Sequence, residues 1–391
     1  MVTRGKGRGE MDNNSKVSKN TRLAYLDNLR ALVIILVISM HTAVTYSGLG
    51  EWYYVEGSYE KLGIFELVFF AFYQSFLQAW FIGILFFISA YWATKSLAKH
   101  GAFKFIKDRL FRLGLPLLIY VFIVSPFILF ILLRINPENS FAKNFIIYIV
   151  DFWWLGSTGP LWFVQTLLIF CIVYAVMKTL KVKPIQINNI NTAKIVFVVI
   201  LITIIAFFVR IILPIGTSYL NLQFPYFPSY IVMFIMGLLI GENNLLENIT
   251  DSKNTKWLKW TFIIGVPIWV ATVVFGGALE GKTYFNGGFH WQNFAFALWE
   301  SFTAISFSIG IIAYFKKKAN VENKFSILLR ENAFGIYCFH APILIFTSLV
   351  LRSLQLNPVL KFILVLALAA FLCLIFSFLI RKIKPIGILF K

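Results

Sequence analysis

The stretch Leu-Asp-Asn-Leu-Arg-Ala-Leu-Val-Ile-Ile-Leu-Val-Ile-Ser-Met-His, residues 26–41, decides the fold. With the residues up to 47 it is long and apolar enough to cross a bilayer as a helix. On that helix Arg30 and His41 are about three turns, or roughly 16 Å, apart and share one face, with Asp27 nearby. Ionisable side chains inside a bilayer are costly unless they face a bundle interior or a wet cavity. They are therefore candidate functional residues, and the alternative is a histidine that only satisfies a structural hydrogen bond.

Similar apolar runs recur along the whole chain. Of the 391 residues, 59% are hydrophobic and only 14% are charged, which is not the composition of a soluble domain. We therefore predict an all-α polytopic membrane protein, a bundle of about ten transmembrane helices. The predicted spans lie near 29–47, 66–92, 113–133, 160–178, 194–213, 226–241, 257–276, 292–315, 333–351 and 359–380. They form one membrane domain, residues 22–385, between a disordered cytoplasmic N-terminal tail, 1–21, and a short cytoplasmic C-terminal tail, 386–391.

The basic residues predict the orientation of the bundle. If both termini are cytoplasmic and the loops alternate, 28 of the 36 lysines and arginines fall inside and 7 outside, with Arg30 at the inner boundary. This is the asymmetry expected of a multi-pass plasma-membrane protein. The net charge of +19 then reflects orientation and anionic lipids, and its spread over short loops argues against nucleic-acid binding.

Cysteine and histidine usage argues against a metal centre. The three cysteines all lie in apolar spans, where they act as small core residues. No three of the four histidines have the spacing of metal ligands, so we predict no metal. Soluble catalytic motifs, such as a phosphate-binding glycine loop, are missing as well.

Two arginines stand at the inner end of the third span. Arg109 and Arg112 are three residues apart, so a helix would point them the same way. Paired guanidinium groups suit phosphate oxygens, whereas the alternative is a positive flank that only sets orientation.

Three further candidates lie in or beside later spans. His340, three residues after Tyr337, precedes Pro342, which can open a kink in the ninth span. Glu300 lies well inside the eighth span, where a carboxylate must be paired, protonated or facing water. Trp162 follows Gly-Pro-Leu at the outer end of the fourth span, where it either anchors the interface or stacks on a sugar. A structural hydrogen bond for His340 and an interfacial position for Glu300 remain open alternatives.

The combination resembles the membrane acyltransferase-3 family. Arg30 and His41, with ten residues between them, resemble that family's first motif, and Arg109-x-x-Arg112 resembles its second. Residues 86–92, 159–164 and 337–340 resemble further recurrent stretches, and 41–47 is similar to the branch that modifies periplasmic glucans. The resemblance covers roughly residues 22–385.

The resemblance implies an O-acyltransferase that moves an acetyl or succinyl group from cytoplasmic acyl-CoA to a hydroxyl of an envelope polysaccharide or glycolipid. It implies catalytic roles for His41, Arg30, Asp27 and His340, with His41 as base or acyl carrier. Arg109 and Arg112 would bind acyl-CoA. The residues expected at the acceptor are Glu300, Trp162 and Tyr337.

Two other classes of protein also fit parts of the pattern. A secondary transporter would show polar residues at mid-membrane, but paired helices broken by glycine or proline are missing. A structural or sensory membrane protein would tolerate loss of His41.

Overall fold

The structure is a computed structural model that describes residues 23–183, 185–384 and 386–390. Within these ranges the chain is almost wholly helical, and the only β-type pairing is an isolated bridge between Tyr219 and Leu222. The predicted tail 1–21 lies outside the described residues. At the other end, Phe390 is 2% exposed and packs against Phe339 of α12 (Lys324–Val350) with ring centroids 4.9 Å apart.

The predicted ten-span architecture is confirmed: in the described residues ten helical segments are long and apolar enough to cross a membrane. Nine of them centre on α1 (Ala24–Ser47), α2 (Ile64–His100), α6 (Trp162–Thr179), α7 (Thr192–Ile212), α8 (Phe227–Glu242), α10 (Lys256–Phe275), α11 (Trp291–Lys318), α12 (Lys324–Val350) and α13 (Pro358–Lys382). The tenth, the third in sequence, is the continuous run Ala102–Leu132, which begins with α3 (Ala102–Arg109) and includes α4 (Leu115–Ile119). Two shorter helices, α5 (Phe141–Val150) and α9 (Leu246–Thr250), lie between spans.

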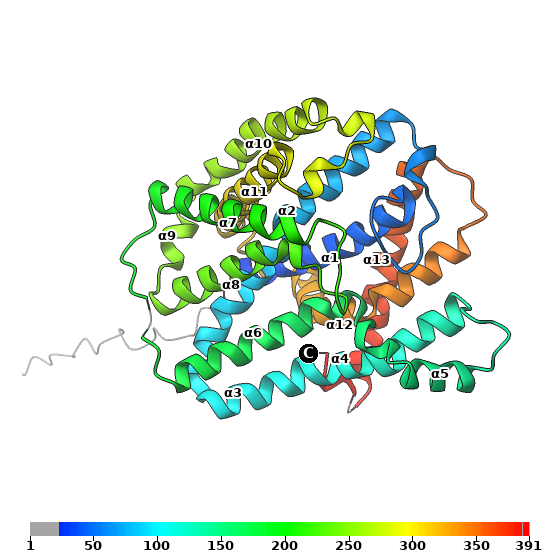
Figure 1. The fold of residues 1–391 in the computed structure, drawn as a ribbon. Helices are drawn as coiled ribbons and strands as arrows, with labels where there is room; N and C mark the ends of the chain where they lie inside the picture. The colour runs from blue at the N-terminus through cyan, green and yellow to red at the C-terminus, as the bar shows by residue number, and fades with distance from the viewer. Residues whose placement is uncertain (1–22, 184, 385, 391) are drawn as a thin grey trace, which may run out of the picture.

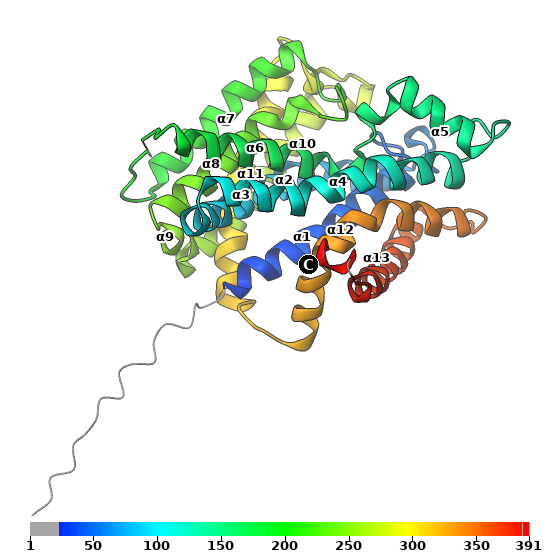
Figure 2. The same cartoon turned by 90° about the horizontal axis from the view of Figure 1, so that it is seen from below.

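Helix α1 lies in the middle of the bundle (Figure 1). It packs against α12 and α13 on one side and against α2 and α11 on the other, as the view from below also shows (Figure 2). Its apolar side chains are accordingly buried, among them Leu29, Val33 and Ile38, each 0% exposed. The first span therefore faces protein around most of its circumference, and its polar side chains are kept away from lipid.

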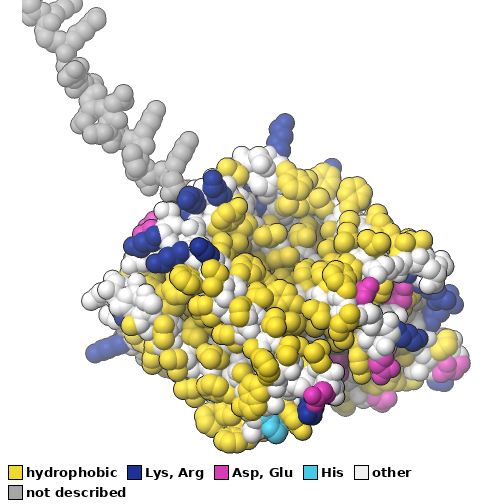
Figure 3. Space-filling model, turned by 90° about the horizontal axis from the view of Figure 1, so that it is seen from above, with side chains coloured by type: hydrophobic (Ala, Val, Ile, Leu, Met, Phe, Trp, Pro, Cys, Tyr) yellow, Lys and Arg dark blue, Asp and Glu magenta, His cyan; other side chains and the backbone are white. Residues whose placement is uncertain are grey.

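The surface of the molecule matches a membrane environment. Figure 3 shows one face with a broad apolar band. Lysine and arginine side chains gather at one end of this face, and acidic side chains with other basic ones lie at the opposite end. Contiguous apolar surface of this extent is expected where lipid chains cover the protein.

The third span departs from a regular α-helix. Residues Leu110–Gly114, Tyr120–Val124 and Phe127–Leu132 are π-helical, with bonds such as Leu115 N–H to the Leu110 carbonyl. Pro116 and Pro126 lie within this span and have no N–H to donate to the preceding turn. The wider π turns keep the backbone bonded around them.

The orientation of the bundle stays a prediction, and cysteine labelling tests it. We name as the outer end the one that carries the connections 48–63, 133–158, 213–223, 276–290 and 351–357, and the opposite end is the inner end. Single cysteines at the exposed positions Glu60 and Lys282 should react with an impermeant maleimide in intact cells, whereas cysteines at Lys104 and Lys317 should not. The native cysteines are buried and give a low background. A reversed pattern at any of the four positions would contradict the topology.

Candidate active site

The outer end of α1 is covered by residues 48–63, a segment that we call the strap. Gly48 ends α1 with a φ of 68°, a left-handed conformation that turns the chain back over the helix. The strap is then fastened by the N–H groups of Glu56 and Gly57, which donate to the Thr45 carbonyl at 2.8 and 3.0 Å. A Cβ at Gly57 would lie 2.0 Å from the Tyr46 carbonyl oxygen, so this close approach requires glycine.

The strap places Trp52 directly on the ring of His41. Their ring centroids are 3.7 Å apart and the planes differ by only 15°. On α12, His340 lies close by, with its centroid 5.4 Å from that of His41 and an interplanar angle of 17°. The two histidines that the sequence offered as rival candidates are therefore neighbours in one aromatic cluster, held by α1, α12 and the strap.

His340 is fixed from its own helix. Its side chain is 0% exposed, and Nδ1 lies 2.7 Å from the Tyr337 carbonyl oxygen, to which it can only donate. That bond leaves Nε2 of the neutral ring as an acceptor, and Nε2 is buried with no hydrogen-bond partner among the described residues. The Tyr337 hydroxyl in turn donates to the carbonyl of Pro160, which joins α12 to the Gly-Pro-Leu-Trp turn before α6.

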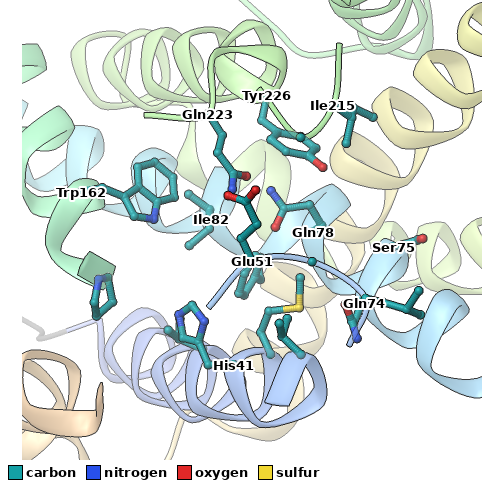
Figure 4. Close-up of a pocket in the computed structure, with 18 of the residues that line it drawn as sticks. His41, Glu51, Gln74, Ser75, Gln78, Ile82, Trp162, Ile215, Gln223 and Tyr226 are labelled. Carbon is teal, nitrogen blue, oxygen red and sulfur yellow. The ribbon is translucent and has the colours of Figure 1, made fainter. Parts of the chain in front are cut away.

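His41 opens onto a cavity of about 310 Å³ at the outer end of the bundle. Figure 4 shows His41 at its base, with Glu51, Gln78 and Gln223 pointing toward one another across it. The wall combines aliphatic side chains and the carboxylates of Glu51 and Glu300 with amides and aromatic rings, which include Gln74, Gln78, Asn221, Gln223, Trp162, Tyr226 and Tyr337. Such a wall offers donors, acceptors and flat apolar faces, the combination that suits a polyhydroxylated ligand.

The predicted carboxylate Glu300 also lines this cavity and has a buried partner. Arg210 on α7, 0% exposed, donates from Nη2 to Glu300 and from Nε to the Pro225 carbonyl at 3.2 Å. The Arg210 guanidinium lies over the ring of Tyr226 at 5.5 Å. The charge pattern places Arg210 among the seven outer basic residues, whereas the structure shows that it pairs with Glu300 inside the bundle.

A second pocket, of about 260 Å³, lies toward the inner end between α1, α2, α3 and α6. Asp27, Arg30 and Arg109 line it together with Ser89, Trp92 and Cys171. Arg30 pairs with Asp27 at 3.2 Å, and the Arg109 guanidinium lies over the Phe105 ring at 5.0 Å. Two cationic side chains from different helices thus meet in one pocket, eleven residues along α1 from His41.

Arg112 does not line this pocket and is exposed, although the sequence placed it on the same face as Arg109. The reason lies in the π-helical residues Leu110–Gly114. A π turn contains more residues than an α turn, so three residues no longer bring the chain back to nearly the same direction.

The sequence reasoning missed several residues of the site, among them Trp52, Glu51 and the Glu300 partner Arg210. Trp52 and Glu51 sit in a loop with no periodic pattern, and only folding brings them to His41. Arg210 did carry a signal, because an arginine inside an apolar run is a functional candidate by default. No cluster of three or more His, Cys, Asp or Glu suited to a metal ion occurs within the part of the chain that the structure describes.

Comparison with known proteins identifies the class. A family model described as an acyltransferase domain, Acyl_transf_3, matches residues 23–382. No curated protein and no solved structure matches the chain. Because the match covers almost all of the membrane bundle, the chain belongs to the acyltransferase-3 family.

Family membership makes the protein a multi-pass membrane enzyme that transfers acyl groups other than amino-acyl groups. It favours this class over the secondary transporter and the structural or sensory protein that the sequence left open. The aromatic cluster and the two pockets are then the places where its chemistry is to be sought.

The buried ion pair generates a stability prediction. Arg210→Gln alone should lower the stability of the purified protein by about 3–5 kcal/mol, because it leaves the buried Glu300 carboxylate without its partner. The double variant R210Q/E300Q should recover part of that loss, as measured by thermal unfolding in a fixed detergent. Lys282→Gln is the control, since its pair with Glu280 is exposed and should give no measurable shift. Equal effects of Arg210→Gln and the double variant would contradict a coupled pair.

Proposed function

We propose that the protein is a plasma-membrane O-acyltransferase that moves an acetyl or succinyl group from cytoplasmic acyl-CoA to a hydroxyl of an envelope polysaccharide or glycolipid. One observation carries the proposal: a single central helix, α1, presents Arg30 to the inner pocket and His41 to the outer cavity. The helix rise separates the two side chains by roughly 16 Å along the axis. A donor bound from inside and an acceptor bound from outside can therefore meet at His41.

The inner pocket is the proposed donor site. Acyl-CoA is a polyanion, and guanidinium groups bind phosphate oxygens through paired hydrogen bonds. Arg30 and Arg109 line the pocket, so they hold the phosphates nearest the bundle, with the narrow pantetheine arm running along α1 toward His41. Exposed Arg112 contributes charge at the inner mouth.

The outer cavity is the proposed acceptor site. Glu300 is neutralised by Arg210, and the rest of the wall combines amides and aromatic rings with aliphatic side chains and the Glu51 carboxylate. Uncharged sugar hydroxyls suit such a wall, with the ring face stacked on Trp162 and hydrogen bonds to Gln78 and Gln223. The lining supports a carbohydrate acceptor better than an aliphatic one.

In the proposed reaction His41 takes the proton of the acceptor hydroxyl as its oxygen bonds to the thioester carbon. The carbon–sulfur bond then breaks, the acyl group stays on the acceptor, and CoA leaves as a thiolate that takes up a proton. If His41 is instead an acyl carrier, its ring nitrogen bonds to the thioester carbon as the carbon–sulfur bond breaks and CoA leaves as a thiolate; the acceptor hydroxyl then takes the acyl group, the bond to the ring nitrogen breaks, and the hydroxyl proton passes to the thiolate. His340, fixed by the Tyr337 carbonyl, offers a second acceptor nitrogen beside this ring.

Histidine substitutions test the catalytic assignment. His41→Ala should lower acyl transfer by about 10²–10⁴ while the protein still inserts, because the base or carrier is lost. His340→Ala should cause a partial loss, and His290→Ala, an exposed residue on an outer loop, should cause none. The product is read as an acyl mass difference in envelope glycans and glycolipids from cells that carry each variant. Normal turnover in His41→Ala with a dead His340→Ala would reverse the two roles, and full activity in both would remove the histidine mechanism.

Two matched arginine variants test the donor site. Arg109→Gln should raise KM for acyl-CoA with little change in kcat, since the side chain lines the pocket and touches no reacting atom. Arg112→Gln, three residues later in the same span and exposed, should raise KM much less. Both are measured on purified protein in proteoliposomes with a fixed acceptor. Equal, small effects would leave Arg109 as an orientation signal only.

A further inference from the structure

Besides covering the outer end of α1, the strap contacts both the outer cavity and the ring of His41. Within it, Leu49, Gly50 and Glu51 line the outer cavity, and the next residue, Trp52, covers one face of His41. Nothing in the sequence pattern links Trp52 to a histidine eleven residues earlier. The contact depends on the turn at Gly48 and on the close approach of Gly57 to Tyr46.

The strap is anchored by a buried charge on α13, a helix that packs directly against α1. Lys361 of α13, only 4% exposed, forms an ion pair with Glu56 and donates to the Arg352 carbonyl at 3.2 Å. Its ammonium group also lies 5.7 Å from the centre of the Tyr46 ring, next to the end of α1. The Lys361 side chain is 5% exposed and that of Glu56 22% exposed, so desolvation offsets much of their attraction and the pair defines the position of the strap more than it adds net stability.

The His41 ring is held in place by contacts with neighbouring aromatic rings. The hydrogen bonds found for residue 41 run through its backbone carbonyl, which accepts from the Thr45 hydroxyl at 2.9 Å. The ring itself is placed by the two rings beside it, that of Trp52 at 3.7 Å and that of His340 at 5.4 Å, with all three planes within 17° of parallel. Parallel stacking restricts rotation about the last side-chain torsion of a histidine, which is otherwise soft.

We propose that Trp52 is a positioning residue: by stacking on His41 it holds the imidazole in the orientation that acyl transfer requires, and the Glu56–Lys361 pair fixes the strap that carries it. The proposal rests on the catalytic role proposed above for His41. It assigns to the strap a part in the reaction in addition to closing the acceptor cavity. Trp52 acts through His41, so its loss changes the rate and leaves substrate binding nearly intact.

Two substitutions of Trp52 distinguish the effect of ring stacking from the effect of side-chain volume. Trp52→Phe keeps a planar ring over His41, whereas Trp52→Leu fills the site with an apolar side chain that cannot stack. Trp52→Leu should lower kcat by about 10²-fold, the cost of a misplaced catalytic group, with KM for acyl-CoA and acceptor changed by less than about threefold. Trp52→Phe should restore most of the rate. Trp153→Ala, at a 39% exposed tryptophan before α6, is the control and should leave kcat unchanged.

A second readout does not depend on turnover. Diethylpyrocarbonate modifies accessible histidine nitrogens, and peptide mass spectrometry gives the rate at His41 in folded protein. That rate should rise several-fold in Trp52→Leu and stay near the starting value in Trp52→Phe and Trp153→Ala. Unchanged labelling of His41 in Trp52→Leu, or a kcat in Trp52→Phe as low as in Trp52→Leu, would overturn the proposal. If labelling behaves as expected but the protein transfers no acyl group, the stacking contact is upheld and the proposed function of His41 fails.

Discussion

The structure depends on the cost of presenting a charged or hydrogen-bonding group to lipid. Backbone groups avoid this cost by forming helices, and polar side chains avoid it by facing the interior of the bundle. Because α1 lies inside the bundle, it can carry His41 and the largely buried Asp27 among protein neighbours, and Arg30 pairs with Asp27 near the inner end. The same constraint explains why Arg210 and Glu300, on two different helices, face each other in the interior.

Burial of polar groups also determines how the outer end is organised. The strap folds back over α1 because Gly48 and Gly57 permit a turn and a close backbone approach that other residues would obstruct. Lys361 then pairs with Glu56 under this segment, so that α13 is tied to the cover of the central helix. The resulting wall places an indole on His41 and lines the cavity with polar side chains.

The separation of the two pockets gives the family's chemistry a physical setting. In the proposed function a charged, water-soluble donor binds apart from the acceptor, and their reacting ends meet at His41. Here the cationic pocket with Arg30 and Arg109 lies toward the inner end, and the amide-rich cavity lies toward the outer end. One helix with a rise of about 1.5 Å per residue connects them, so the spacing of Arg30 and His41 in sequence is also a distance across the membrane.

The sequence by itself determined the class of fold and identified several of the residues that form the site. Apolar runs of spanning length predicted ten helices, which the structure confirms, because hydrocarbon thickness fixes how many residues a span needs. Local spacing also put Arg30 and His41 on one face of one helix. The same reasoning failed to foresee the exposed position of Arg112, since π turns in the third span depend on how the chain accommodates its prolines. Only the tertiary structure decided that His340 and Trp52 meet His41 and that Arg210 pairs with Glu300. Such contacts join residues from separate segments, and the packing of helices, which no local pattern encodes, brings them together.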